Sequence, residues 1–163
     1  MRYISTRGQG EPLTFTETIL NGLARDGGLF IPETFPQVGD QLESWSRLNY
    51  RDLAFEIMSR YADDIPPAEL KAIIDRSYRV FRDPETTPVH PLGDLWLLEL
   101  FHGPTYAFKD IALQFLGNLF EYVLARDGRR MNIIAATSGD TGSAAIQGVR
   151  GRKGIEIFVM HPH

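Results

Sequence analysis

The chain has 163 residues, and its 17 basic and 21 acidic residues give a net charge of −4. This balance, without a basic stripe, argues against nucleic-acid binding, which needs positive charge against the phosphates. The absence of cysteine excludes disulfides, thiolate metal sites and cysteine nucleophiles. The N-terminus carries no apolar leader and no long apolar run follows, so we expect a cytoplasmic protein that enters no membrane.

The first half of the chain predicts helices joined by irregular segments. Thr14 and Glu17 fit a capping box for a helix that would end at Gly22. Apolar residues at helical spacing predict a second helix from about Asn49 and a third after Pro67.

A cluster of prolines then changes the pattern. Pro84, Pro88 and Pro91 fix backbone angles and withhold hydrogen-bond donors, so no helix is expected there. We therefore predict a domain boundary, with a mainly helical subdomain at 1–93 and an α/β domain at 94–163.

The second half of the chain alternates strands and helices. The expected strands are 95–100, 131–137 and 155–160, and the expected helices are 111–124 and 143–149. This order implies parallel strands with right-handed crossovers, and hence the α/β fold class with the start of an open parallel sheet covered by helices.

Ligands of such sheets bind at the carboxyl ends of the strands. The loops expected at this edge are 101–105, 138–142 and 161–163. Three histidines lie on them: His102, His161 and His163. A catalytic zinc site needs ligands oriented by further hydrogen bonds, and no pattern here supplies them, so we expect no metal.

Lys109 is predicted at or just inside the start of the helix 111–124. The positive end of the helix dipole and the apolar neighbours Ala107 and Phe108 favour the neutral amine, which is a nucleophile toward aldehydes such as pyridoxal phosphate. Asp110 opposes this effect unless its carboxylate points away to cap backbone amides. The alternative is an ordinary surface lysine with its amine in water.

The loop 138–142 joins a predicted buried strand to a helix. Its two glycines let the backbone approach a bound group, and Ser138 and Thr141 offer hydroxyls beside outward-pointing amides. A carboxylate or phosphate suits this loop, although Asp140 adds a like charge that needs a donor or a cation. The alternative is a tight turn in which Ser138 or Thr141 caps the helix.

A polar stripe runs along the long helix. Its members are Asp110, Gln114, Asn118 and Glu121. Their spacing puts them on one helix face, for which we expect exposure to solvent.

Three motifs together resemble the threonine synthase family, pyridoxal-phosphate enzymes of fold type II, the tryptophan-synthase-like fold. The segment FHGPTYAFKD at 101–110 resembles the cofactor-lysine segment of the family. The segment NGLARDGGLFIP at 21–32 resembles its N-terminal signature, and TSGDTG at 137–142 resembles its substrate loop. Residues 3–7 are also similar, so the resemblance extends over essentially the whole chain.

The resemblance implies that Lys109 holds pyridoxal 5'-phosphate as an imine, beside Phe108, and then moves protons on the substrate carbons. It implies a loop that binds the α-carboxylate of the substrate, with Asp140 near the phenolic oxygen of the cofactor. The residues of this loop are Ser138, Gly139, Asp140, Thr141 and Gly142. The implied reaction converts O-phospho-L-homoserine and water into L-threonine and phosphate.

The sequence departs from the family pattern in two respects. Tyr106 stands where a smaller aliphatic residue is expected. The later glycine-rich loop that binds the cofactor phosphate in the family, and the second half of the sheet, do not occur in the 163 residues. We therefore expect a truncated N-terminal part that is inactive alone, with its oligomeric state left open. The alternatives are a related phospho-lyase or dehydratase, which would keep Lys109, and a non-catalytic anion-binding module, which would not need it.

Overall fold

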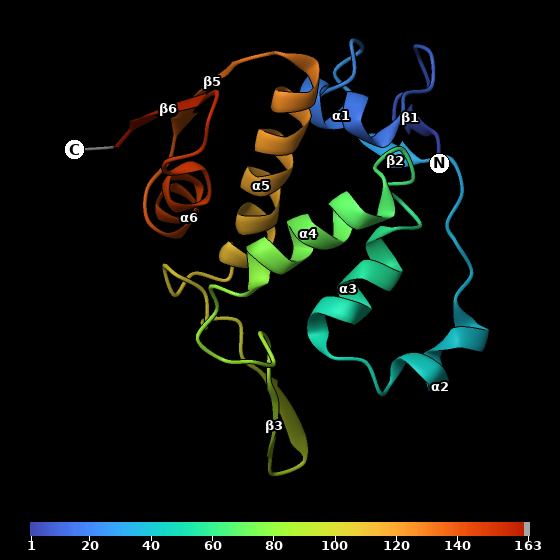
Figure 1. Ribbon diagram of the computed structural model, residues 1–163, viewed down its shortest axis with the longest axis vertical. Helices are drawn as coiled ribbons and strands as arrows, with labels where there is room; N and C mark the ends of the chain where they lie inside the picture. Colours follow the sequence, from blue (N-terminus) through green and yellow to red (C-terminus); the bar gives the residue numbers. More distant parts are fainter. Residues whose placement is uncertain (162–163) are drawn as a thin grey trace. The chain divides into compact units, whose positions relative to one another are not determined.

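The computed structural model of the protein describes residues 1–161. The chain forms two compact units, residues 1–72 and the residues from Ile73 onward. Figure 1 shows the helices and strands of both units in chain order. The boundary predicted at 93 and 94 falls inside the second unit, and the predicted domain limits stay a prediction. No helix in the described range has the length and apolar character needed to cross a membrane.

The first unit contains short strands and helices. Its elements are β1 (Tyr3–Ser5), α1 (Phe15–Asn21), β2 (Phe30–Pro32), a 3-10 turn η1 (Gly39–Gln41), α2 (Leu42–Trp45), α3 (Tyr50–Met58) and the start of α4 (Pro67–Tyr78). β1 and β2 pair antiparallel. The sequence did not predict β1, η1 or α2, because elements of three or four residues are too short to show a hydrophobic period.

The predicted helix boundaries in this unit are confirmed. Thr14 Oγ1 accepts a hydrogen bond from the Glu17 amide at 3.4 Å, and the Thr14 amide donates to Glu17 Oε2 at 2.8 Å, which completes the capping box. Gly22 ends α1 with a φ of 71°. The side chain of Asn49 caps α3 by accepting from the Asp52 amide at 3.0 Å. Each boundary rests on contacts within four residues, which explains why the sequence predicted it.

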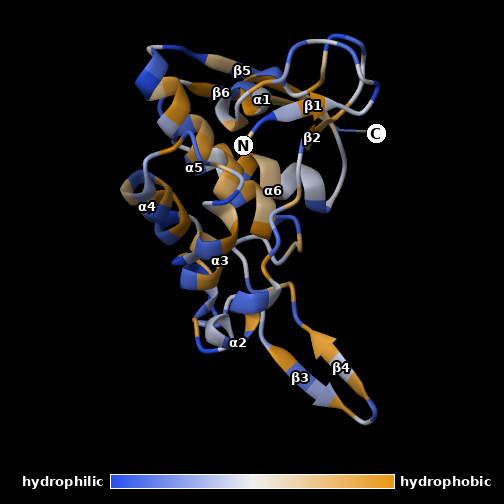
Figure 2. Cartoon of the chain, turned by 90° about the vertical axis from the view of Figure 1, so that its right-hand side faces the viewer, coloured by the Kyte–Doolittle hydropathy of each residue, from blue (hydrophilic) through white to orange (hydrophobic). Residues whose placement is uncertain are grey.

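After the last residues of α4, the second unit contains a hairpin that the sequence did not predict. β3 (Val89–Leu92) and β4 (Leu95–Leu98) pair antiparallel, and both strands are exposed on both faces. Figure 2 shows this hairpin coloured largely hydrophobic. The prediction of a buried parallel strand at 95–100 is therefore wrong. Gly93, at a φ of 61°, turns the chain back at once, so the strand pairs with its immediate predecessor.

The parallel sheet itself is confirmed. β5 (Met131–Ala136) and β6 (Ile155–Met160) pair in parallel, joined by α6 (Asp140–Val149). Ile133 and Ile157 face the helices, whereas Ile134 and Phe158 point to the opposite, exposed face. The class is α/β with the start of an open parallel sheet, as predicted.

Two glycines let α5 (Asp110–Asp127) and α6 pack closely. A Cβ atom on Gly117 would lie 1.9 Å from the carbonyl oxygen of Gly148. A Cβ atom on Gly148 would lie 2.5 Å from the carbonyl oxygen of Leu113. No side chain fits at either position, so the two helices meet backbone to backbone.

Three of the four residues of the polar stripe on α5 are buried and Glu121 is part-exposed, which overturns the expectation of a solvated face. Asp110, Gln114 and Asn118 are all at most 4% exposed. Asn118 donates to Ser77 Oγ at 3.0 Å and accepts from Arg152 Nη1 at 2.8 Å. The stripe faces α4 and the turn after α6, where Asn118 finds its hydrogen-bond partners in other side chains.

Candidate active site

Lys109 is the residue that immediately precedes α5, where the sequence placed it. Its side chain is half-buried, and its Nζ lies 5.0 Å from the ring centroid of Phe108. Within residues 1–161 the amine makes no hydrogen bond and no ion pair. An amine that is tied to no carboxylate is available to react with a carbonyl compound.

Asp110, the acidic neighbour of Lys109, turns away from the amine. Its carboxylate is 0% exposed and accepts hydrogen bonds from the Thr105 amide at 2.7 Å and from Thr105 Oγ1 at 2.9 Å. This is the arrangement in which, on the sequence-based expectation, Asp110 leaves the reactivity of the Lys109 amine unopposed. The carboxylate caps the preceding loop, and its charge is directed at an amide and a hydroxyl.

The loop before Lys109 is tightly folded. Gly103 lies against Asp110, and a Cβ atom on Gly103 would be 2.4 Å from the Asp110 Cβ. Tyr106 has a φ of 64°, a left-handed conformation that costs a residue other than glycine about 1–3 kcal/mol. Its amide donates to the Gly103 carbonyl at 3.2 Å. The unexpected tyrosine thus occupies a strained position close to the lysine.

The loop 138–142 is open by comparison. Gly139 is the N-cap residue of α6, with φ 66° and ψ −136°, and no side chain caps this helix. The alternative in which Ser138 or Thr141 caps the turn is therefore wrong. Among residues 1–161 the side chains of Ser138, Asp140 and Thr141 make no hydrogen bond, and all three residues are exposed. Such an N-terminus with uncapped amides suits an anion.

Both loops belong to the second unit, and each leads into a helix. The chain turns at Gly128, which has a φ of 64°, between α5 and β5. The segment before Lys109 leads into α5, and the loop 138–142 follows β5 and leads into α6. His161, after β6, borders this loop, because a Cβ atom on Gly142 would lie 3.8 Å from His161 Cε1.

His102 and His161, the described histidines of the predicted edge, have different neighbours. His102 Nε2 lies 2.7 Å from Glu99 Oε2, and this pair belongs to the segment that follows the hairpin. His163, with Pro162, lies outside the described residues. Among residues 1–161 no three histidine, aspartate or glutamate side chains are arranged to hold a metal ion.

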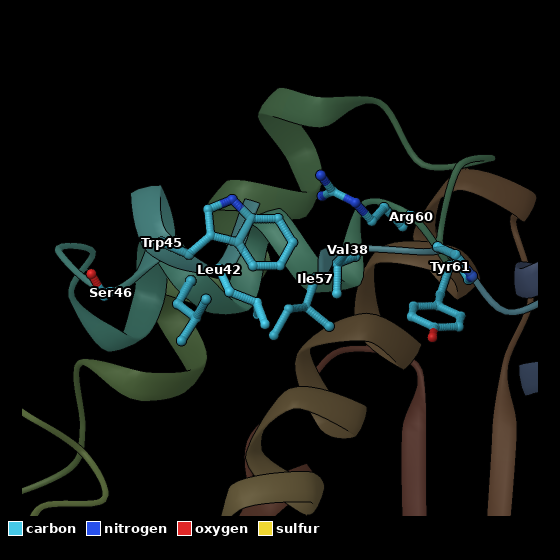
Figure 3. Close-up of a pocket in the computed structure, with 9 residues that line it drawn as sticks. Val38, Leu42, Trp45, Ser46, Ile57, Arg60 and Tyr61 are labelled. Carbon is cyan, nitrogen blue, oxygen red and sulfur yellow. The ribbon is translucent and has the colours of Figure 1, made fainter. Parts of the chain in front are cut away.

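A cavity in the first unit has a different chemistry. It has a volume of about 350 Å³ and an apolar lining that includes Trp45 and Ile57 (Figure 3). The guanidinium of Arg60, its charged group, lies 4.6 Å from the Trp45 ring centroid and bonds to Gln41 and Glu56. The charged group of this cavity is therefore already engaged by neighbouring residues.

Sequence reasoning missed one residue near the lysine. Arg82 contacts the loop 103–106, although it lies 27 positions before Lys109. No local pattern could have indicated this contact, because it forms only when the segment after α4 folds beside the loop.

Comparisons with known proteins relate the chain to one family. The family described as the N terminus of threonine synthase matches residues 2–78. The threonine synthase of Methylobacillus glycogenes is 52% identical, over 100% of this chain and 37% of its own length.

Two crystal structures are similar to the chain throughout. The pyridoxal-phosphate-bound threonine synthase of Brucella melitensis has a TM-score of 0.96 and 40% identity, covering 100% of this chain and 36% of that one. The yeast threonine synthase has a TM-score of 0.93 and 50% identity, covering 99% and 35%. The chain thus spans about a third of the length of these relatives.

Proposed function

The chain belongs to the threonine synthase family, and on this premise we propose that the full-length protein converts O-phospho-L-homoserine and water into L-threonine and phosphate. In this proposal Lys109 holds pyridoxal 5'-phosphate through its amine. The observation that carries the proposal is the amine of Lys109, which makes no hydrogen bond or ion pair with the described residues and belongs to the same unit as the uncapped amides at the start of α6.

The residues present fit the cofactor. Among residues 1–161 no carboxylate pairs with the Lys109 amine, and the exposed ring of Phe108 is beside it for contact with a flat aromatic group. When bound, pyridoxal phosphate supplies an electron sink that makes protons on the α and β carbons of an amino acid removable. The groups that would hold its phosphate belong, in this proposal, to the part of the enzyme that the relatives carry in addition.

The loop 138–142 would bind the carboxylate of the substrate. The free amides at the start of α6 and the hydroxyls of Ser138 and Thr141 supply donors, and the helix dipole favours a negative charge there. Asp140, exposed on the same loop, would face the cofactor. Lys109 would take and return protons at the substrate carbons, while water adds to the β carbon and phosphate leaves from the γ carbon.

Replacement of Lys109 tests the proposal directly. Full-length protein should gain the visible absorption of a lysine-bound cofactor when pyridoxal phosphate is added, and Lys109→Ala should lose this absorption and the release of phosphate. Lys153→Ala is the matched control, because Lys153 is an exposed lysine of the same unit whose ammonium makes no hydrogen bond or ion pair with the other described residues. Retention of the absorption in Lys109→Ala would remove Lys109 from its role.

A further inference from the structure

The segment 102–106, which leads to Lys109, has no regular secondary structure that would hold it in place. It is instead contacted from outside at successive residues. On one side Asp110 accepts from the amide and the hydroxyl of Thr105. Its conformation therefore depends on side chains at its flanks.

Arg82 supplies the contacts on the other side. Its amide donates to the carbonyl of His102 at 2.9 Å. Its guanidinium donates to the carbonyl of Gly103 and, at 3.4 Å, to that of Pro104. The guanidinium carbon also lies 3.9 Å from the ring centroid of Tyr106. One arginine thus contacts four of the five residues of the segment.

The geometry of these contacts suits arginine in particular. A planar guanidinium can donate to two carbonyls in its own plane and lie against an aromatic ring with its face, whereas an ammonium cannot do both. The ring contact involves Tyr106, whose left-handed backbone needs support from its surroundings. The direction in which the chain enters α5, and with it the position of Lys109, follows from this arrangement.

We infer that Arg82 is a positioning residue for Lys109, which acts by holding the segment 102–106. The inference rests on the proposed role of Lys109 as the cofactor lysine. Loss of Arg82 should leave the amine present but less well placed, because small displacements of a reacting group reduce rates strongly.

The test uses full-length protein with Arg82→Met, Arg82→Lys, Tyr106→Leu and Tyr106→Phe. Arg79→Met is the matched control, because Arg79 is an exposed arginine of the same unit whose guanidinium makes no interaction with the other described residues. Two quantities are measured: the rate at which the visible absorption appears when pyridoxal phosphate is added, and amide hydrogen exchange in the peptide 102–108 of the cofactor-free protein.

Arg82→Met should slow cofactor attachment about tenfold and speed exchange of the Thr105 and Tyr106 amides by a similar factor. Arg82→Lys should recover only part of the loss. Tyr106→Leu should act in the same direction more weakly, while Tyr106→Phe and Arg79→Met should behave as wild type. If Arg82→Met does not fold, Tyr106→Leu still tests the same contact.

Other outcomes would overturn the inference. Unchanged attachment and exchange in Arg82→Met would show that the segment holds itself. A rise in the KM for substrate with unchanged attachment would make Arg82 a substrate-binding residue, and a lower unfolding temperature alone would make it a structural one. Absence of the visible absorption in wild-type protein would instead reject the proposed function, whatever the exchange data show.

Discussion

The two loops proposed to form the site differ in how they are held. The segment before Lys109 is fixed from both sides, by Asp110 and by Arg82. The loop 138–142 has no side-chain cap, and its polar side chains make no bond within the described residues. Both loops precede a helix of the same unit, so the difference does not arise from the type of element.

The difference between the two loops fits the different roles proposed for them. A reacting group benefits from a loop that already holds it in position, because the loop then needs no further ordering when the ligand binds. A loop that receives an anion needs donors that are still unpaired when the anion binds. We therefore expect the loss of a side-chain contact in the first loop to lower stability as well as cofactor attachment, and the loss of a polar side chain from the second loop to lower turnover.

The largest loss of stability is expected for Asp110→Ala. The change removes a buried carboxylate and leaves the part-buried Thr105 amide without its acceptor, and should lower the free energy of unfolding by about 2–4 kcal/mol. Urea unfolding of the full-length protein measures this difference. Asp127→Ala is the control at the other end of α5, where the carboxylate pairs with Arg126 near the surface and little change is expected. Equal losses for both variants would show that Asp110 does not hold the loop.

A smaller loss is expected for Gly139→Ala. A φ of 66° is unfavourable for alanine, whereas a Cβ atom at this position would meet nothing within 4 Å. The free energy of unfolding should therefore fall only by the cost of this backbone conformation, about 1–2 kcal/mol. Gly39→Ala is the control, because that position also has open space but no left-handed φ. The same unfolding measurement applies. A loss as large as that of Asp110→Ala would contradict the description of this loop as open.

Asp140→Ala should change stability by less than about 0.5 kcal/mol, because the side chain is exposed and makes no bond among the described residues. It should nevertheless lower kcat by at least about tenfold while cofactor uptake stays close to wild type, if Asp140 acts at the bound cofactor. Phosphate release measures turnover and the visible absorption measures cofactor uptake, so both are recorded for the same variant. Loss of cofactor uptake with normal turnover of the loaded fraction would contradict the assignment of this loop.

The smallest effect is expected in the first unit, where the carboxylate of Asp26 holds a loop through hydrogen bonds. The Gly28 amide and then the Ser5 hydroxyl donate to Asp26 and hold the pKa of its carboxyl below the ordinary value. The folded-state pKa is thus lower than the unfolded one, so this stabilisation is present above about pH 4 and is lost as the pH falls through the folded value.

Asp26→Asn should therefore flatten the acid side of the stability profile. Urea unfolding of full-length protein between pH 3 and 6 measures this, with Asp140→Asn as the control because Asp140 caps nothing among the described residues. An unchanged slope below pH 4 would show that the bonds of Asp26 contribute nothing to folding.

Comparison of the helix caps with the hairpin shows how far the sequence could predict the fold. Thr14 and Glu17 bond within one helical turn, so their pattern alone predicts the start of α1. An apolar run such as 95–98 fits a buried parallel strand as well as a strand of a hairpin, so its composition does not distinguish the two. Only the pairing with 89–92 decided between them.

The polar stripe on α5 shows the same limit. Spacing placed Gln114 and Asn118 on one face of the helix. The sequence pattern of a polar face is the same whether that face packs against another polar surface or is exposed to water. The partner of Asn118, Arg152, lies 34 positions later and contacts it only after α6 has packed against α5.

The sequence by itself determined the helix caps, the α/β class, the place of Lys109 at the start of a helix and the glycine-containing loop after β5. Each of these depends on residues within a few positions of one another, whose interactions form wherever the segment lies. The tertiary structure alone decided that Asp110 turns to Thr105, that Arg82 holds the lysine segment and that the polar stripe is buried. Those contacts depend on which surfaces meet when distant segments pack, and a local pattern carries no information about that.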